Sequence, residues 1–215
     1  MREKIINEVL NQKIIAIVRG ADKNQALEAA KALCAGGVNF VEVTFNQREP
    51  DKFIETANAI SLIKEHLGDK MFVGAGTVTT PELVNIAASA GAQYIISPDT
   101  DKRVIFETRE KNLVSMPGSY TPSEAKMAHE WGADFVKLFP CVGNAPEYVK
   151  AICAPFNHIR FLAVGGVNAA NAADFLKAGA VGLGVGSSLV SKKDLDLGAY
   201  EEITNKARQF VAAIK

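Results

Sequence analysis

The sequence predicts an α/β protein: a single (β/α)8 TIM barrel with an extra N-terminal helix, occupying residues 1–215 as one domain. Two observations predict this fold. Eight short apolar runs alternate with longer amphipathic runs, and four of the amphipathic runs end in a glycine that leads into the next apolar run. An open doubly wound sheet is the alternative, but no Gly-x-Gly-x-x-Gly follows the first apolar run.

Residues 1–8, at the start of the chain, are charged and amphipathic and predict the extra helix. The apolar runs that follow predict the strands. They are mostly apolar throughout, as expected for a parallel sheet that is covered on both faces. In chain order these runs are residues 14–18, 40–44, 72–75, 94–97, 114–116, 135–139, 161–164 and 182–185.

Capping patterns predict where helices begin. In a capping box, the N-cap side chain and the third helical residue each satisfy the other's backbone N–H. Asp22 with Gln25 fits this pattern. The other predicted starts are Thr80 before Pro81, Thr121-Pro122-Ser123-Glu124, and Asn168 ahead of a run to Leu176.

Glycine predicts where helices end, because it adopts the left-handed conformation that closes a helix. The four such exits are Gly36-Gly37, Gly91, Gly132 and Gly179.

The composition excludes several classes of protein. Hydrophobic residues make up 48% of the chain and charged residues 22%, which excludes wholesale disorder. Lys plus Arg number 24 and so do Asp plus Glu, so the basic excess of a nucleic-acid binder is missing. No run approaches the roughly 18 apolar residues of a membrane span. The 3 cysteines have no CxxC spacing, which favours a reducing compartment. We therefore expect a cytoplasmic protein that binds neither nucleic acid nor membrane.

Three charged residues are expected to meet at the mouth of the barrel. Active sites of this fold form at the C-terminal ends of the strands. Side chains alternate between the two faces of a strand, so Arg19, Glu42 and Lys137 each share a face with apolar residues two positions away. If those faces point inward, the three charges converge.

Lys137 has no polar neighbour on either side. Burial disfavours an ammonium and lowers its pKa, and Schiff-base chemistry with a ketone requires a neutral amine. The alternative is that the stem of Lys137 packs in the core while its ammonium pairs with Glu42.

Glu42 lies between Val41 and Val43, which makes it a candidate general acid/base whose pKa is raised by burial. Its alternative role is that of partner in a structural ion pair, although a buried pair adds little net stability. A carboxylate near Lys137 favours the charged amine, and Arg19 is expected to offset that effect by holding Glu42.

Glycine clusters follow the last two predicted strands. Gly165-Gly166 ends the seventh and Gly186-Ser187 ends the eighth, the places where this fold commonly binds phosphate through backbone N–H groups. The alternative is that both are only tight turns. Thr77, after the third strand, either helps to bind a carboxylate or belongs to a turn.

Together these segments resemble the class I, pyruvate-forming aldolases that cleave 2-keto-3-deoxy-6-phosphogluconate (KDPG) and 4-hydroxy-2-oxoglutarate (KHG). The similarity covers almost the whole chain, in the order of that family. It is carried by Ile17-Val18-Arg19, Val41-Glu42-Val43-Thr44, Gly74-Ala75-Gly76-Thr77-Val78, Ile96-Ser97-Pro98, Met116-Pro117-Gly118, Lys137-Leu138-Phe139-Pro140, Val164-Gly165-Gly166 and Gly184-Val185-Gly186-Ser187.

The resemblance implies a role for each candidate residue. Lys137 forms the Schiff base, Glu42 shuttles protons and Arg19 positions Glu42. It further implies a phosphorylated keto-sugar acid as substrate, a homotrimer, and neither metal nor cofactor. The implied substrate contacts are Thr77 at the carboxylate, Gly165, Gly166, Gly186 and Ser187 at the phosphate, and Phe139 and Pro98 along the pocket.

Two positions depart from the usual phosphogluconate pattern. Asn46 stands where those members often have Arg, and Val164 stands where they often have Thr. Members acting on the phosphogalactonate epimer more often look like this chain at both places. The expected reaction is cleavage of KDPG to pyruvate and glyceraldehyde 3-phosphate, with KHG as a further substrate. The alternatives are the phosphogalactonate epimer, another phosphate-binding barrel enzyme such as an isomerase or cyclase, and a non-catalytic sugar-phosphate sensor.

Overall fold

Strands form at all eight predicted places. The computed structural model describes residues 1–143 and 145–215. The strands are β1 (Ile14–Val18), β2 (Phe40–Thr44), β3 (Phe72–Gly76), β4 (Tyr94–Ile96), β5 (Val114–Met116), β6 (Gly118–Ser119), β7 (Val136–Leu138), β8 (Phe161–Val164) and β9 (Gly182–Val185).

The strands pair in the order β5-β4-β3-β2-β1-β9-β8-β7-β6, and each pairing is parallel. Only Pro117 separates β5 from β6, the two ends of this order, so they are two parts of one barrel strand. Pro has no backbone N–H and interrupts the ladder. The carbonyl of Pro117 nevertheless accepts a hydrogen bond from the N–H of Lys137 at 2.9 Å, which closes the ring toward β7. The predicted eight-stranded barrel is confirmed.

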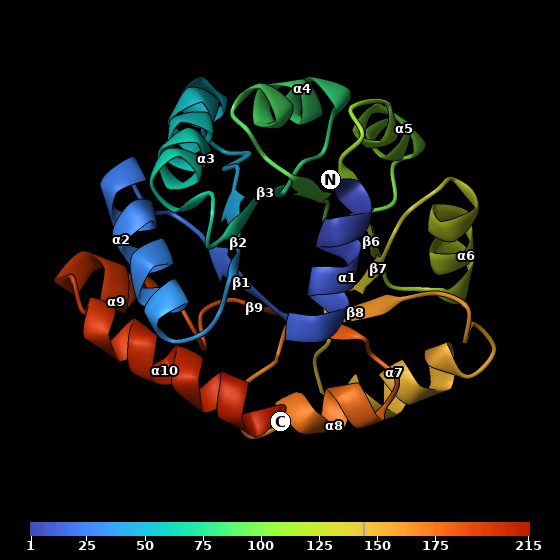
Figure 1. Cartoon of the computed structure of the whole chain (residues 1–215). Helices are drawn as coiled ribbons and strands as arrows, with labels where there is room; N and C mark the ends of the chain where they lie inside the picture. The colour runs from blue at the N-terminus through green and yellow to red at the C-terminus, as the bar shows by residue number, and fades with distance from the viewer. Residues whose placement is uncertain (144) are drawn as a thin grey trace.

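Helices surround the ring of strands (Figure 1). They are α2 (Lys23–Ala35), the short 3-10 helix η1 (Pro50–Lys52), α3 (Phe53–Leu67), α4 (Pro81–Ser89), α5 (Lys102–Glu110), α6 (Pro122–Glu130), α7 (Ala145–Cys153), α8 (Ala172–Lys177), α9 (Lys192–Leu197) and α10 (Tyr200–Ala213). One further helix, α1 (Arg2–Gln12), lies across one opening of the ring.

Three of the predicted helix starts are confirmed. Asp22 and Thr121 both form complete capping boxes, and Thr80 accepts a hydrogen bond from the N–H of Leu83. The predicted glycine exits are confirmed as well. Their φ angles are positive: 89° at Gly37, 92° at Gly91, 98° at Gly132 and 112° at Gly179.

The predicted start at Asn168 is wrong. Its side chain accepts hydrogen bonds from the N–H groups of Ala170 and Asn171, as an N-cap would. The chain between them forms a turn, however, and α8 begins only at Ala172, with Asn171 as the N-cap. The capping bonds are present, but they stabilise the turn that precedes the helix.

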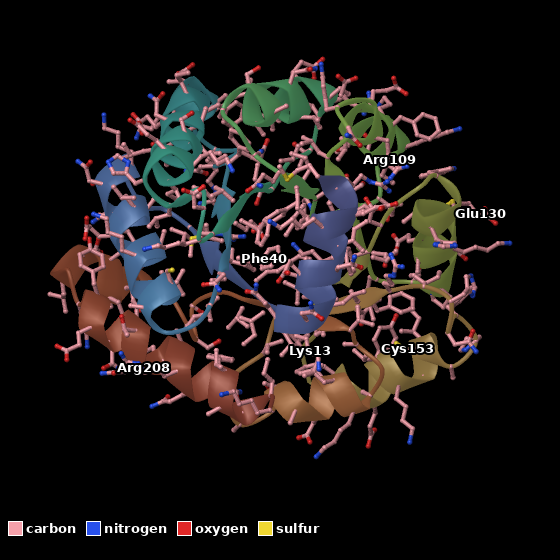
Figure 2. The ribbon with its side chains drawn as sticks, viewed as in Figure 1. Lys13, Phe40, Arg109, Glu130, Cys153 and Arg208 are labelled. Atoms are coloured by element: carbon pink, nitrogen blue, oxygen red, sulfur yellow. The ribbon has the colours of Figure 1, made fainter. Side chains whose placement is uncertain are left out.

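The barrel has two hydrophobic layers because side chains alternate along each strand. The outer layer packs the sheet against the surrounding helices and includes Val41, Val43 and Leu138. The inner layer fills the ring and includes Phe40 and Phe135. Figure 2 shows Phe40 inside the ring, whereas Glu130 and Arg208 lie on the surrounding helices.

The predicted N-terminal helix closes one opening of the barrel. Figure 1 shows α1 lying across the centre of the ring. Ile5, Ile6 and Val9 join the inner hydrophobic layer. An ion pair between Arg2 and Asp134, the residue just before Phe135, ties α1 to the end where the strands begin. The opposite end, where the strands finish, is therefore the one left for a ligand. No helix in the described part of the chain is long and apolar enough to cross a membrane.

Candidate active site

Glu42 and Lys137 lie on the inner face of the barrel, as alternation predicts. The side chains two positions before them, Phe40 and Phe135, belong to the inner hydrophobic layer. Glu42 is 2% exposed and Lys137 is 6% exposed. Arg19 is exposed at the end of β1. The three residues therefore converge, two of them inside the barrel and one at its rim.

Burial is the main influence on Lys137 and lowers the pKa of its ammonium. The charge of Glu42 opposes this by favouring the ammonium, while the charge of Arg19 lowers the pKa further. The ammonium also lies 4.7 Å from the centre of the Phe139 ring. The net effect is an amine that loses its proton more readily than an exposed lysine, which is the form that attacks a carbonyl carbon.

Burial also dominates at Glu42 and raises the pKa of its carboxyl group. Lys137 and Arg19 both act in the opposite direction through their positive charges. A carboxyl group with a raised pKa exchanges protons closer to neutral pH than an ordinary glutamate, so Glu42 has the property that a general acid/base needs.

The expected contact between Arg19 and Glu42 is not formed. Within the described residues, Glu42 has no hydrogen bond or ion pair with Arg19, and no ion pair within 4.0 Å joins Glu42 to Lys137. Arg19 influences Glu42 through its charge alone. The separation of Glu42 from Lys137 argues against a purely structural ion pair and leaves the carboxylate available for a ligand or water.

Two glycines of β3 make room for this site. A Cβ atom at Gly76 would overlap the carboxylate of Glu42, and a Cβ atom at Gly74 would overlap the ring of Tyr94. The hydroxyl group of Tyr94 is buried without a hydrogen-bond partner among the described residues. Because Gly74 and Gly76 have no side chains, the large polar groups of β2 and β4 fit inside the barrel.

A cavity of about 490 Å³ opens where β8 and β9 end, and we call it the β8–β9 cavity. Six of the predicted site residues line it: Arg19, Phe139, Gly165, Gly166, Gly186 and Ser187. The other residues that line it are Ile17, Gly20, Val164, Val167, Gly184, Ser188, Val190 and Lys192.

The glycines of this cavity have distinct structural roles. Gly166 has a φ of 71°, and a Cβ atom there would overlap the carbonyl of Cys141. Gly186 instead faces open space, since a Cβ atom there would meet no atom within 4 Å. The hydroxyl of Ser188 donates a hydrogen bond of 2.5 Å to the carbonyl of Val167, which joins the two glycine loops. Backbone groups of both loops are thus held around one open volume.

A second cavity of about 340 Å³ lies beside the ends of β2 and β3, and we call it the β2–β3 cavity. It shares Arg19 and Gly20 with the first cavity, so the two adjoin at the rim. The predicted residues Asn46 and Thr77 line it. Thr77 has a φ of 55°, which is unusual for a β-branched residue and is often found at functional sites. Pro98, although it follows β4, lines neither cavity.

Two cationic residues of these cavities were not predicted from the sequence. Arg48 lines the β2–β3 cavity and Lys192 lines the β8–β9 cavity. Both are exposed and lie among other charged residues, so neither has the apolar setting that marks Lys137 and Glu42. The signal for Arg48 was its position two residues after Asn46, in the same loop.

No group of three or more His, Cys, Asp and Glu side chains in residues 1–143 and 145–215 is arranged to hold a metal ion. The candidate site brings together a buried amine, a buried carboxyl group and two adjoining cavities with cationic rims.

The chain is similar to known aldolases over almost its whole length. The family model for KDPG and KHG aldolases matches residues 5–206. The 2-dehydro-3-deoxy-6-phosphogalactonate aldolase of Escherichia coli strain K12 is 34% identical over 94% of this chain and 93% of its own length. The 2-dehydro-3-deoxy-phosphogluconate aldolase of Dickeya dadantii is 36% identical over 87% and 85% of the two chains.

A solved structure adds a chemical parallel. The KDPG aldolase of Legionella pneumophila, with pyruvate captured at low pH as a covalent carbinolamine intermediate, is 26% identical. It superposes with a TM-score of 0.83 and covers 94% of this chain and 96% of that chain.

Proposed function

The chain belongs to the KDPG and KHG aldolase family, and from this premise we propose that it cleaves 2-dehydro-3-deoxy-6-phosphogluconate to pyruvate and glyceraldehyde 3-phosphate. As a member of that family it is a class I aldolase, a carbon–carbon lyase. The observation that carries the proposal is a buried lysine with a lowered pKa, which shares the inner face of the barrel with a buried glutamate.

We assign the covalent step to Lys137. Its neutral amine adds to the C2 ketone to give a carbinolamine, and loss of water gives the protonated imine. Glu42 takes the proton of the C4 hydroxyl as the C3–C4 bond breaks. The electrons of that bond move to the imine, which becomes an enamine, and glyceraldehyde 3-phosphate leaves. Protonation at C3 and hydrolysis of the imine then release pyruvate and restore the amine of Lys137.

We assign the two cavities to the two ends of the substrate. The β2–β3 cavity accepts the carboxylate through Thr77 and Asn46, with Arg48 as an additional cation. The β8–β9 cavity accepts the phosphate through Gly165, Gly166, Gly186 and Ser187, while Phe139 lines the wall. Arg19 adjusts the pKa of Glu42 by its charge from the shared rim.

The test is pyruvate release from four candidate substrates, namely the phosphogluconate acid, its phosphogalactonate epimer, the unphosphorylated gluconate acid and KHG. We expect the wild-type enzyme to cleave both phosphorylated acids far better than the other two. Lys137→Met and Lys137→Arg should both abolish release, since a guanidinium stays protonated. Release at the wild-type rate by either variant would contradict the proposal.

The two phosphorylated epimers require a direct comparison, because named relatives of both kinds match at 34% and 36% identity. Asn46 offers an amide where Arg would offer a charge-assisted grip, and Val164 offers no hydroxyl. We therefore expect relaxed discrimination between the C4 epimers, and a shift toward the gluconate form in Asn46→Arg with Val164→Thr. A gluconate preference above about 10⁴ in the wild type would assign the choice to other residues.

We also propose that the enzyme works in the cytoplasm as a homotrimer. The free cysteines Cys34, Cys141 and Cys153 favour a reducing compartment.

Large apolar side chains that this chain leaves exposed, including Ile54, Phe106 and Val142, favour an interface between subunits. Light scattering measures the mass directly, and a monomeric mass at micromolar concentration would contradict the trimer.

A further inference from the structure

We propose that Lys192 is the cation that recognises the substrate's phosphate in the β8–β9 cavity, and that it leaves its partner Asp196 to do so. The proposal rests on the phosphorylated substrate class proposed above and adds a specificity-determining residue to it.

The position of Lys192 fits this role. It is the first residue of α9, shortly after the Gly186 loop, and it lines the cavity together with both glycine loops. Its stem runs past Gly20, where a Cβ atom would lie 3.9 Å from Cδ and 4.0 Å from Cε of Lys192. Lys192 therefore spans the rim between the end of β1 and the loop after β9, and its ammonium pairs with Asp196.

The charge of the ligand favours a cationic side chain beside the glycine loops. A phosphate monoester carries about −1.5 to −2 charges at pH 7. The glycine loops supply backbone N–H groups and the hydroxyl of Ser187, all of them uncharged. Among the described residues that line this cavity, only Arg19 and Lys192 carry positive charge. Arg19 also faces the β2–β3 cavity and adjusts the pKa of Glu42, which leaves Lys192 as the cation assigned to the phosphate.

The present partner of Lys192 is easily exchanged. Lys192 pairs with Asp196 one helical turn away, and their side chains are 60% and 52% exposed. Exposed pairs of this type are worth little because water and salt screen them. A phosphate held by the two glycine loops offers Lys192 a doubly charged acceptor in place of a singly charged one. Asp196 thus competes with the substrate for the same ammonium.

The experiment compares kcat/KM for the phosphorylated acid and for its unphosphorylated counterpart in four proteins: wild type, Lys192→Met, Lys193→Met and Asp196→Asn. Lys193 is the matched control, because it is the adjacent exposed lysine of α9 and lines neither cavity. We expect Lys192→Met to lose about three- to tenfold on the phosphorylated acid, mainly through KM, and nothing on the other acid. Lys193→Met should match the wild type, and Asp196→Asn should lower KM for the phosphorylated acid.

Salt gives a second readout. Added salt should reduce kcat/KM for the phosphorylated acid more steeply in the wild type than in Lys192→Met, because the variant has lost one screened attraction. Equal losses on both acids would overturn the proposal by showing that Lys192 is structural, and so would equal behaviour of the Lys192 and Lys193 variants. If the wild type had equal kcat/KM for the two acids, the proposed substrate class would be wrong. If the wild type preferred the phosphorylated acid and Lys192→Met kept the same kcat/KM for it, only the role of Lys192 would be wrong.

Discussion

Lys137 and Glu42 each shift the pKa of the other inside one buried site. Burial lowers the pKa of Lys137 and raises that of Glu42, so it favours the neutral form of both groups. Their opposite charges restore part of the ionised population. Arg19 acts on both groups in the same direction, because its positive charge at the rim lowers both pKa values.

This arrangement predicts opposite pH shifts in two variants. Glu42→Gln removes the charge that raises the pKa of Lys137, so the midpoint for imine formation with pyruvate should move to lower pH. Arg19→Met removes a charge that lowers that pKa, so the midpoint should move to higher pH. The measurement is the initial rate of borohydride trapping as a function of pH. Shifts in the same direction, or none, would contradict the electrostatic role given to these residues.

The sequence predicted the buried candidates Lys137 and Glu42 and the rim residue Arg19, but not the further cations Arg48 and Lys192. Lys137 and Glu42 stand out because a charge among apolar neighbours marks burial, and alternation along a strand gives the direction of the side chain. Arg48 and Lys192 lie on exposed loops and helix starts, where charged residues are common. Their relation to a cavity depends on the path of those loops in space, which no local pattern encodes. The absence of contact between Arg19 and Glu42 depends on side-chain positions in the same way.

At the scale of elements, β3 makes the site possible because two of its inner positions, Gly74 and Gly76, have no side chain. Gly76→Ala would push a methyl group into the carboxylate of Glu42. We expect imine formation with pyruvate to persist while aldol cleavage falls by about 10²-fold or more, the size typical of losing a general acid/base. Gly182→Ala is the control at an inner position of β9, where the methyl group would meet Leu162 at 2.9 Å. That variant should lose stability but keep kcat; equal kcat in the two variants would contradict this role of Gly76.

The N-terminal helix should affect stability without affecting catalysis, because α1 closes the end of the barrel opposite the site. Ile5 is 1% exposed, so Ile5→Ala should lower the free energy of unfolding by about 2–4 kcal/mol and leave kcat unchanged. Asn7→Ala, at an exposed position of the same helix, should change it by no more than about 0.5 kcal/mol. Denaturant unfolding and steady-state kinetics measure both effects. A large fall in kcat for folded Ile5→Ala would show that α1 is coupled to the site.

The sequence also predicted most elements, because strand and helix signals are local. All eight predicted barrel strands and three of the four predicted helix starts agree with the structure. The break at Pro117 and the delayed start of α8 do not follow from periodicity. The break at Pro117 depends on the neighbouring strand to which each half of the barrel strand forms hydrogen bonds. The start of α8 depends on whether the residues after Asn168 continue as a helix or as a turn.

For the whole molecule, the pKa shifts of Lys137 and Glu42 imply that burying these two groups lowers the stability of the fold. The lowered pKa of Lys137 costs stability below its unfolded value of 10.5, and this cost vanishes as the pH rises to that value. The raised pKa of Glu42 costs stability above its unfolded value of 4.5, and this cost vanishes as the pH falls to that value. Both costs are present at pH 7.

The double variant Glu42→Gln with Lys137→Met should therefore unfold at a higher temperature than the wild type. We expect a gain of about 1–3 kcal/mol at pH 7, or roughly 2–4 °C for each kcal/mol, with smaller gains toward pH 4.5 and pH 10.5. The control, Lys126→Met with Glu130→Gln, removes a pair that is 63% and 56% exposed and should change little. Calorimetry at several pH values measures this, and a double variant less stable than the wild type at pH 7 would contradict the account.

The central claim is that the amine of Lys137 forms a covalent imine with the keto acid. The most direct test incubates the wild-type enzyme with pyruvate, reduces it with borohydride, and locates the modified lysine by peptide mass spectrometry. The account predicts one pyruvate-derived adduct, on the peptide that contains Lys137, and none in Lys137→Met. An adduct on another lysine, or none in an enzyme that still cleaves the phosphorylated acid, would contradict it.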